Sequence, residues 1–325
     1  MIISKTPLRM SFAGGGSDFK GYYQRGYGSV VSTAIDKYIY VTINKKFDDL
    51  IRVSYSKTEG VKNIKDIEHN LIREALKLTG VTKGIDINYV SDMLPAHEGT
   101  GLGASSSLIV GILNALYAYK GQRVPADRLA EEACKIEIEI LRSPIGKQDQ
   151  YAVAFGNFNF IKFNADENVS IEPIICKKET KEGLNKNLLL FYTNMGSLSE
   201  NILFEQNKKI DINVEILDKM VQLAERLKES LENNDLKEFG NILHQNWLYK
   251  QQLASKITNP AINEHYKKAR DAGAIGGKIL GSGGGGFLLL YCEPKNQNRV
   301  RQALSALKET SFNFESEGSK IVYVD

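Results

Sequence analysis

Hydrophobic and polar residues alternate in two long stretches near the start of the chain, residues 2–12 and 35–43. In the second stretch Lys37 shares one face with four apolar residues, Ile35, Ile39, Val41 and Ile43. Successive side chains of a β-strand point to opposite faces, so this pattern predicts two half-buried strands. Shorter apolar runs predict further strands at 84–91, 186–193, 287–291 and 320–324.

Apolar residues spaced three and four apart predict helices between these strands. The clearest series is Leu217, Met220, Ala224, Leu227 and Leu231. Gly121 and Pro144 are natural helix stops, and Pro125 suits a first helical turn. The predicted helices cover residues 66–79, the segment from Leu108 to Gly121, the segment from Pro125 to Pro144, and residues 217–231, 236–256, 260–272 and 297–309.

Strands and helices are mixed in both halves of the chain, which predicts an α+β protein. At 325 residues the chain is long enough for two domains of ordinary size. The polar stretch 177–185 precedes an apolar strand and is the predicted boundary. The expected domains are therefore residues 1–185 and residues 186–325.

The overall charge argues against polyanionic partners. The chain has 42 Lys and Arg against 39 Asp and Glu, a formal net charge of +3, and the two signs are interspersed. No field of one sign is available to hold nucleic acid or an anionic membrane. The 3 cysteines form no C-x-x-C pair, and we find no secretory leader or membrane-spanning run. We therefore expect a soluble cytoplasmic protein, and the sequence leaves open whether it forms a homodimer.

A loop rich in glycine and serine precedes the helix that ends at Gly121. It contains Gly99, Gly101 and Gly103, followed by three serines in a row. Unpaired backbone N–H groups and the positive end of the helix dipole make such a helix start suitable for phosphate. No lysine follows the last glycine, so the loop is not a Walker loop. A plain glycine turn capped by serine is the alternative.

The loop matches the pattern P-x-x-x-G-x-G-L-G-[AS]-S-S-[SA], which runs from Pro95 to Ser107. This pattern resembles the phosphate signature of the GHMP kinases, and two further stretches, Pro7 to Asp18 and Lys278 to Gly286, resemble that family's first and third motifs. The resemblance implies an amino-terminal domain like ribosomal protein S5 and a ferredoxin-like carboxy-terminal domain. It also implies ATP and Mg²⁺ as cofactors. The implied ATP phosphate contacts are Gly99, Gly101, Leu102, Gly103, Ala104, Ser105, Ser106 and Ser107.

The resemblance also implies the residues that perform phosphoryl transfer. The segment Gly-Lys-Gln-Asp-Gln that ends at Gln150 resembles the part of galactokinase and mevalonate kinase that carries the catalytic aspartate, so Asp149 is the expected base. Arg9 matches an arginine beside that aspartate. For Mg²⁺ the family uses a serine of the loop and a glutamate, here Ser106 and Glu137. Glu139 is the alternative. Only one of the two glutamates can be the ligand, because side chains two positions apart on a helix cannot face the same phosphate.

Asp18 matches a family aspartate that binds sugar hydroxyls, and a carboxylate suits that task because it accepts two hydroxyl protons. We expect it to contact the substrate. Lys147 and Lys250 are candidate partners for a phosphate on the sugar. The full set of expected substrate contacts is Gly15, Gly16, Ser17, Asp18, Lys147, Gln148, His244, Lys250, Gly283 and Gly284.

Within the family, the first motif resembles that of the heptose phosphate kinases most closely. This implies phosphorylation of the anomeric hydroxyl of a sugar phosphate, D-glycero-D-manno-heptose 7-phosphate. One departure leaves the exact sugar open, because the run from Asn194 to Ser199 has no basic residue where that group has one. Kinases of fucose, galactose or a mevalonate-type substrate, a decarboxylase, and a sensor without turnover remain alternatives.

Overall fold

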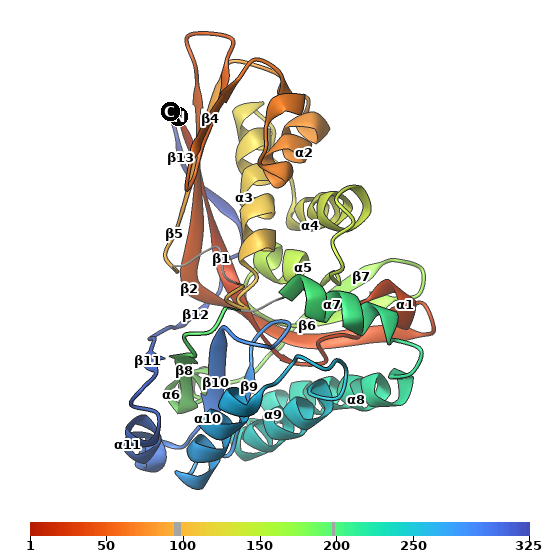
Figure 1. The fold of residues 1–325 in the computed structure, drawn as a ribbon, viewed down its shortest axis with the longest axis vertical. Helices are drawn as coiled ribbons and strands as arrows, with labels where there is room; N and C mark the ends of the chain where they lie inside the picture. The colour runs from red at the N-terminus through yellow and green to blue at the C-terminus, as the bar shows by residue number, and fades with distance from the viewer. Residues whose placement is uncertain (94–98, 197–198) are drawn as a thin grey trace.

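The larger of two β-sheets forms the upper part of the molecule in Figure 1. The computed structural model describes residues 1–93, 99–196 and 199–325. In this part of the chain the larger sheet has 9 strands, and its main path has the order β13-β1-β2-β5-β3-β4. β6 and β12 pair with β2, and β7 pairs with β6. The strands are β1 (Ile2–Ala13), β2 (Tyr27–Lys45), β3 (Ile51–Ser54), β4 (Thr58–Val61), β5 (Ile85–Ser91), β6 (Phe158–Asn164), β7 (Val169–Pro173), β12 (Phe314–Glu315) and β13 (Lys320–Val324).

The smaller sheet has 4 strands in the order β11-β8-β10-β9. Of its two central strands, β10 is buried along its whole length and β8 at every residue except Tyr192, which explains their continuous apolar sequence. Helix α8 (Val214–Glu232) contacts both β2 of the larger sheet and helix α9 (Leu236–Lys250) beside the smaller sheet, so it joins the two halves. The strands are β8 (Leu188–Tyr192), β9 (Gly276–Ile279), β10 (Phe287–Tyr291) and β11 (Lys308–Glu309).

Helices cover one face of the larger sheet, and α6, α9 and α10 contact the smaller one (Figure 1). Among the helices on the larger sheet, α3 packs against β1 and β2, and α2, α4 and α5 lie around α3. The helices are α1 (Lys20–Tyr23), α2 (Asn70–Thr79), α3 (Ala104–Tyr119), α4 (Ala126–Cys134), α5 (Gln148–Phe155), α6 (Lys178–Asn187), α7 (Ser199–Lys208), α8 (Val214–Glu232), α9 (Leu236–Lys250), α10 (Pro260–Asp271) and α11 (Pro294–Ala303).

The predicted α+β class and most predicted elements are confirmed. Helix α3 ends just before Gly121, whose φ of 71° is left-handed. The helix predicted between Pro125 and Pro144 changes its geometry, because α4 continues into one turn of π-helix, η2 (Lys135–Ile140). Turns of this kind inside helices are frequent at functional sites, and Glu137 lies in this one.

Other predicted bounds were wrong. The helix expected at 66–79 is a 3₁₀ turn, η1 (Ile64–Asp66), followed by α2. The carboxylate of Glu59 interrupts it by accepting the backbone N–H groups of Glu68 and His69. The helices expected at 236–256 and 297–309 end earlier, at Lys250 and Ala303.

The polar stretch 177–185, expected at the domain boundary, lies mostly in helix α6. The last strand, β13, returns to the larger sheet and pairs with β1. The two ends of the chain consequently lie side by side, and Asp325 N donates to Met1 O at 3.0 Å (Figure 1). The boundary itself stays a prediction. Among the described helices, none combines the length and the apolar character needed to cross a bilayer.

Candidate active site

The glycine loop at residues 99–103 lies against the last glycine-rich loop of the chain, at residues 281–286. Gly101 has a φ of 78°, and a Cβ on it would lie 2.3 Å from the carbonyl oxygen of Leu280. A Cβ on Gly286 would in turn lie 2.6 Å from the carbonyl oxygen of Thr100. Glycine is therefore required on both sides of this contact. Pro95, the first residue of the expected phosphate signature, lies outside the described residues.

The three serines at the start of α3 have different partners. Ser105 and Ser106 both donate to the carboxylate of Glu137, Ser106 at 2.8 Å. Ser107 donates to backbone carbonyls instead, that of Pro7 at 2.8 Å and that of Gly103 at 3.0 Å. The hydroxyl of Ser107 therefore stabilises the loop, whereas those of Ser105 and Ser106 face the acidic group.

Glu137 is the buried member of the two alternative glutamates. It has 2% of its surface exposed and accepts a third hydrogen bond, from Gln150 Nε2 at 2.6 Å. Burial raises the pKa of the Glu137 carboxyl, and the bonds from Ser105 and Ser106 act against that rise. Glu139 is exposed to solvent. The structure thus places Glu137, and not Glu139, beside the phosphate loop.

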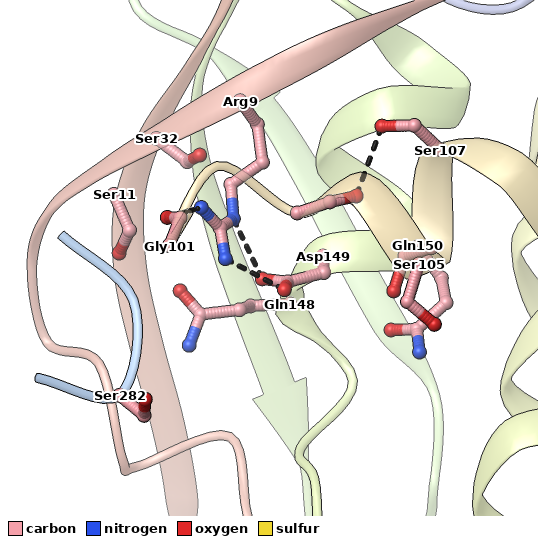
Figure 2. A network of polar contacts seen from close by, with 12 residues as sticks. Arg9, Ser11, Ser32, Gly101, Ser105, Ser107, Gln148, Asp149, Gln150 and Ser282 are labelled. Carbon is pink, nitrogen blue, oxygen red and sulfur yellow. Dashed lines mark hydrogen bonds and ion pairs between the residues drawn. The ribbon is translucent and has the colours of Figure 1, made fainter. Parts of the chain in front are cut away.

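Arg9 joins the phosphate loop to Asp149. Its Nε donates to Asp149 Oδ1 at 2.7 Å and its Nη2 to Oδ2 at 2.6 Å (Figure 2). The remaining nitrogen, Nη1, donates to the carbonyl oxygen of Gly101 at 2.6 Å. The guanidinium is almost fully buried and Asp149 is 26% exposed. The carboxylate is therefore held in one orientation and still reaches the cavity.

Asp18 is buried beside the first glycine motif. It accepts the backbone N–H of Gly16 at 2.9 Å, that of Gln148 at 3.2 Å and the side-chain amide of Gln148 at 3.0 Å. Burial raises the pKa of Asp18, and the nearby charge of Asp149 adds to the rise. Ser17, an expected substrate contact, donates to the carbonyl oxygens of Gly14 and Ser29 and so supports the turn.

Two buried lysines approach the same region. Lys250 Nζ donates to Gln206 Oε1 at 3.0 Å and to Gly15 O at 3.4 Å. Lys278 Nζ donates to the carbonyl oxygens of Ser11 at 2.7 Å and of Phe12 at 3.4 Å. Burial lowers the pKa of Lys250 to about 8 and that of Lys278 well below its ordinary value. Among the described residues neither amine has a carboxylate within ion-pair distance.

Lys278 had no expected role. The feature of the sequence that could have marked Lys278 as a site residue is its position. It is a single cation in a strand of glycine and isoleucine, directly before the last glycine loop.

The side chain of Lys147 does not enter this region, although its backbone N–H donates to Asp18 O at 3.3 Å. Its Nζ pairs with Glu167, and it lies 5.1 Å from the centre of the Tyr23 ring. Lys147 lines neither of the two cavities described below.

The two cavities are not lined by His244, Gly283 or Gly284 either. His244 Nδ1 is 2.6 Å from the hydroxyl of Tyr266 on the neighbouring helix. A Cβ on Gly283 would lie 2.6 Å from the carbonyl oxygen of Ile257, and Gly284 N donates to the same oxygen at 2.8 Å. These glycines therefore shape the last loop and do not line the cavities.

Two neighbouring cavities meet at Asp149. One, of about 290 Å³, lies along the phosphate loop and Glu137. The other, of about 70 Å³, lies between Asp18, Lys250 and Lys278. The residues that line both are Arg9, Ile145, Asp149, Leu203, Gly281 and Ser282. A cavity of about 830 Å³ between α3 and β13 is larger, but it is lined by none of the expected site residues.

The oxygen atoms of the first cavity suit Mg²⁺ held together with phosphates. Ser105, Ser106 and Glu137 offer two hydroxyls and one carboxylate, and Mg²⁺ commonly takes one or two carboxylates plus phosphate oxygens. Within the described part of the chain, no three His, Cys, Asp or Glu side chains form a metal cluster. Any Mg²⁺ here would therefore depend on the nucleotide for further oxygen ligands.

Two family models match the chain. The GHMP kinases N terminal domain matches residues 64–157, and the GHMP kinases C terminal model matches residues 227–310. The D-glycero-alpha-D-manno-heptose 7-phosphate kinase of Campylobacter jejuni is 31% identical to this chain over 339 residues, covering 98% of each sequence.

Solved structures agree with these matches. A D-glycero-D-manno-heptose 1-phosphate kinase from Bacteroides thetaiotaomicron has a TM-score of 0.82 at 26% identity and covers 100% of both chains. A putative sugar kinase from Campylobacter jejuni has a TM-score of 0.79 at 27% identity, covering 99% of this chain and 98% of the other. The predicted two-domain GHMP kinase fold is confirmed.

Proposed function

Because the chain belongs to the GHMP kinases, we propose that it transfers the γ-phosphoryl group of ATP to the anomeric hydroxyl of a sugar phosphate. D-glycero-D-manno-heptose 7-phosphate is the proposed acceptor, since two relatives of full length carry a manno-heptose phosphate in their names. The observation that carries the proposal is the meeting of two cavities at Asp149 and Arg9. This arrangement suits a donor on one side and an acceptor on the other.

Asp149 is the proposed base for the acceptor hydroxyl. The hydroxyl proton passes to the Asp149 carboxylate while the oxygen bonds to the γ-phosphorus, and the bond from that phosphorus to the β-phosphate oxygen breaks to release ADP. Arg9 fixes the orientation of the carboxylate through its two hydrogen bonds. Because Asp149 is only partly exposed, a bound sugar would exclude most of the remaining water from it.

The nucleotide phosphates would lie along Gly99 to Ala104 at the start of α3. Ser105, Ser106 and Glu137 would hold Mg²⁺ beside them. The metal ion, when bound, supplies positive charge against the charge that develops on the transferred group. Gln150 would keep the Glu137 carboxylate turned toward the serines through its bond at 2.6 Å.

Lys250 and Lys278 are the proposed partners of the phosphate that the sugar already carries. Both amines are buried, and their described partners are uncharged oxygens. A buried ammonium without a counter-ion is unfavourable, and a bound phosphate would supply the missing negative charge. Lys278 takes the role that was expected of Lys147, which pairs with Glu167.

A coupled assay of ADP release tests the proposal. The acceptors are heptose 7-phosphate, unphosphorylated heptose, galactose, fucose and mevalonate. We expect ADP release with heptose 7-phosphate at the highest kcat/KM. Binding of ATP and sugar without ADP release would indicate a sensor, and release of CO₂ with ADP would indicate a decarboxylase. Either result would overturn the kinase proposal.

A further inference from the structure

Two buried polar atoms beside Asp149 have no hydrogen-bond partner among the described residues. They are Ser11 Oγ and Gln148 Oε1. Both residues line the smaller cavity. Ser11 follows Arg9 by two positions on β1, so the strand presents both side chains on one face. Gln148 precedes Asp149 at the start of α5.

The backbone of Gly15 leaves space next to these two atoms. A Cβ built on Gly15 would lie 3.7 Å from Ser11 Oγ, 3.9 Å from Gln148 Oε1 and 3.6 Å from Gln148 Nε2. The two unpartnered atoms therefore border one small volume that no side chain fills. In the view of Figure 2 the side chain of Gln148 lies between Ser11 and Asp149.

Other buried polar atoms without a partner, such as Gln150 Oε1 and Gln206 Nε2, belong to residues that do not line this cavity. Gln148 Nε2 donates to Asp18 Oδ1 at 3.0 Å, so the orientation of the amide leaves its oxygen free for a donor. Ser32, the cross-strand neighbour of Ser11, donates its hydroxyl proton to Met10 O at 2.9 Å. A buried polar atom without a partner costs free energy, and at binding sites the ligand commonly supplies the partner.

We propose that Ser11 Oγ and Gln148 Oε1 form a subsite for one hydroxyl of the sugar, in the space that Gly15 leaves open. A hydroxyl fits because it can donate to the Gln148 oxygen and accept from the Ser11 hydroxyl at once. This inference rests on the proposed function, since it names how the acceptor sugar is recognised. A sugar that lacks this hydroxyl would leave two buried groups unpaired, which is an effective basis for discrimination.

Ser11→Ala and Gly15→Ala test the subsite from two directions. Ser11→Ala removes one partner, whereas Gly15→Ala fills the space with a Cβ at ordinary contact distance from its neighbours. Gly15 has no left-handed φ, so the backbone accepts alanine without strain. Ser32→Ala and Gly26→Ala are the matched controls, because Ser32 lines neither active-site cavity and a Cβ on Gly26 meets nothing within 4 Å.

We expect Ser11→Ala and Gly15→Ala to lower kcat/KM for heptose 7-phosphate by about 10- to 100-fold, mainly through KM, while both controls stay near wild type. A panel of monodeoxy heptose 7-phosphates then identifies the hydroxyl. For one of these deoxy sugars, the kcat/KM of wild type should fall by the same factor as the kcat/KM of Ser11→Ala falls for the full sugar. The kcat/KM of Ser11→Ala should not fall further with that deoxy sugar.

The subsite would be overturned if Ser11→Ala lowered kcat/KM, relative to wild type, by the same factor for every deoxy sugar. Unchanged kinetics in both Ser11→Ala and Gly15→Ala would also overturn it. Sugar binding is also measured by titration calorimetry, which does not depend on turnover. If wild type binds the sugar but releases no ADP, the kinase proposal fails while the calorimetric comparison of the same sugars and variants still decides the subsite.

Discussion

Arg9 holds Asp149 at two points, with Nε donating to Oδ1 at 2.7 Å and Nη2 donating to Oδ2 at 2.6 Å. The third guanidinium nitrogen binds the carbonyl oxygen of Gly101 in the phosphate loop. One side chain from the first strand therefore fixes the proposed base relative to the nucleotide site. Only arginine offers a planar fork for such a two-point contact.

Asp149→Asn should lower kcat by about 10²- to 10⁴-fold, the usual effect of losing a positioned acid–base group. The amide has nearly the same shape, so the melting temperature and the affinity for ATP should stay close to wild type. Steady-state kinetics, calorimetry with ATP and a thermal melt measure these effects. Wild-type turnover in Asp149→Asn would remove this residue from the mechanism.

Arg9→Lys should lower kcat by about 10-fold or more, although the positive charge is kept. An ammonium cannot reach both Asp149 oxygens and the Gly101 carbonyl in one fixed geometry. The pre-steady-state rate of ADP formation isolates this step from product release. A kcat equal to wild type would show that the charge alone matters and that the two-point contact does not.

Ser106→Ala and Glu137→Gln should each raise the Mg²⁺ concentration needed for half-maximal activity by about 10-fold or more. Ser105→Ala should act in the same direction, because Ser105 also donates to Glu137. Glu139→Gln is the matched control, since Glu139 is exposed on the same helical turn. Activity is titrated against Mg²⁺ at fixed ATP. If only Glu139→Gln changes the requirement, the proposed ligand is wrong.

Lys278→Met should raise KM for heptose 7-phosphate by about 10- to 100-fold, which corresponds to about 1.5–3 kcal/mol for a charge-assisted contact. The variant also loses the hydrogen bonds to Ser11 O and Phe12 O, so the loss of the phosphate contact must be distinguished from a general structural effect. The ratio of KM for phosphorylated and unphosphorylated heptose does this. An equal rise for both sugars would mean that Lys278 only joins the two sheets.

Binding of the sugar phosphate should take up protons near pH 8. Burial, with a smaller contribution from the positive charge of Arg9, lowers the pKa of Lys250 to about 8, although the negative charges of Asp18 and Asp149 act in the opposite direction. A bound phosphate favours the ammonium form and raises this pKa again. Hence kcat/KM for the phosphorylated acceptor should fall as pH rises above about 8.

Calorimetry in two buffers of different ionisation enthalpy measures the proton uptake directly. Lys250→Met is the comparison, because it lacks the titrating amine. Proton uptake that is unchanged in Lys250→Met would assign the titration to another group.

Local sequence was sufficient for the elements that carry the chemistry. The glycine and serine run predicted the start of α3, and the alternation at 35–43 predicted one face of β2. The first half of β2 was missed because residues 28–35 are buried on both faces, so no polar alternation marks them. Glu137 was favoured over Glu139 by family spacing, and its burial in the π-turn agrees with that choice.

Contacts between distant segments could not be predicted. Lys278 and Ser11 meet across two sheets, and neither has neighbours in sequence that mark a site. Lys147 was expected to face the sugar because of its position beside Gln148, but it pairs with Glu167 in the turn between β6 and β7. The charge of a residue was visible in the sequence, whereas the direction of its side chain depended on the packing.

The product formed from ATP and heptose 7-phosphate tests the central claim most directly, and phosphorus NMR identifies it. We predict a bisphosphate whose new signal couples to the anomeric proton, formed by wild type and at least about 100-fold more slowly by Asp149→Asn. A new phosphate at any other carbon, equal product formation from unphosphorylated heptose, or no transfer to sugar at all would contradict the account.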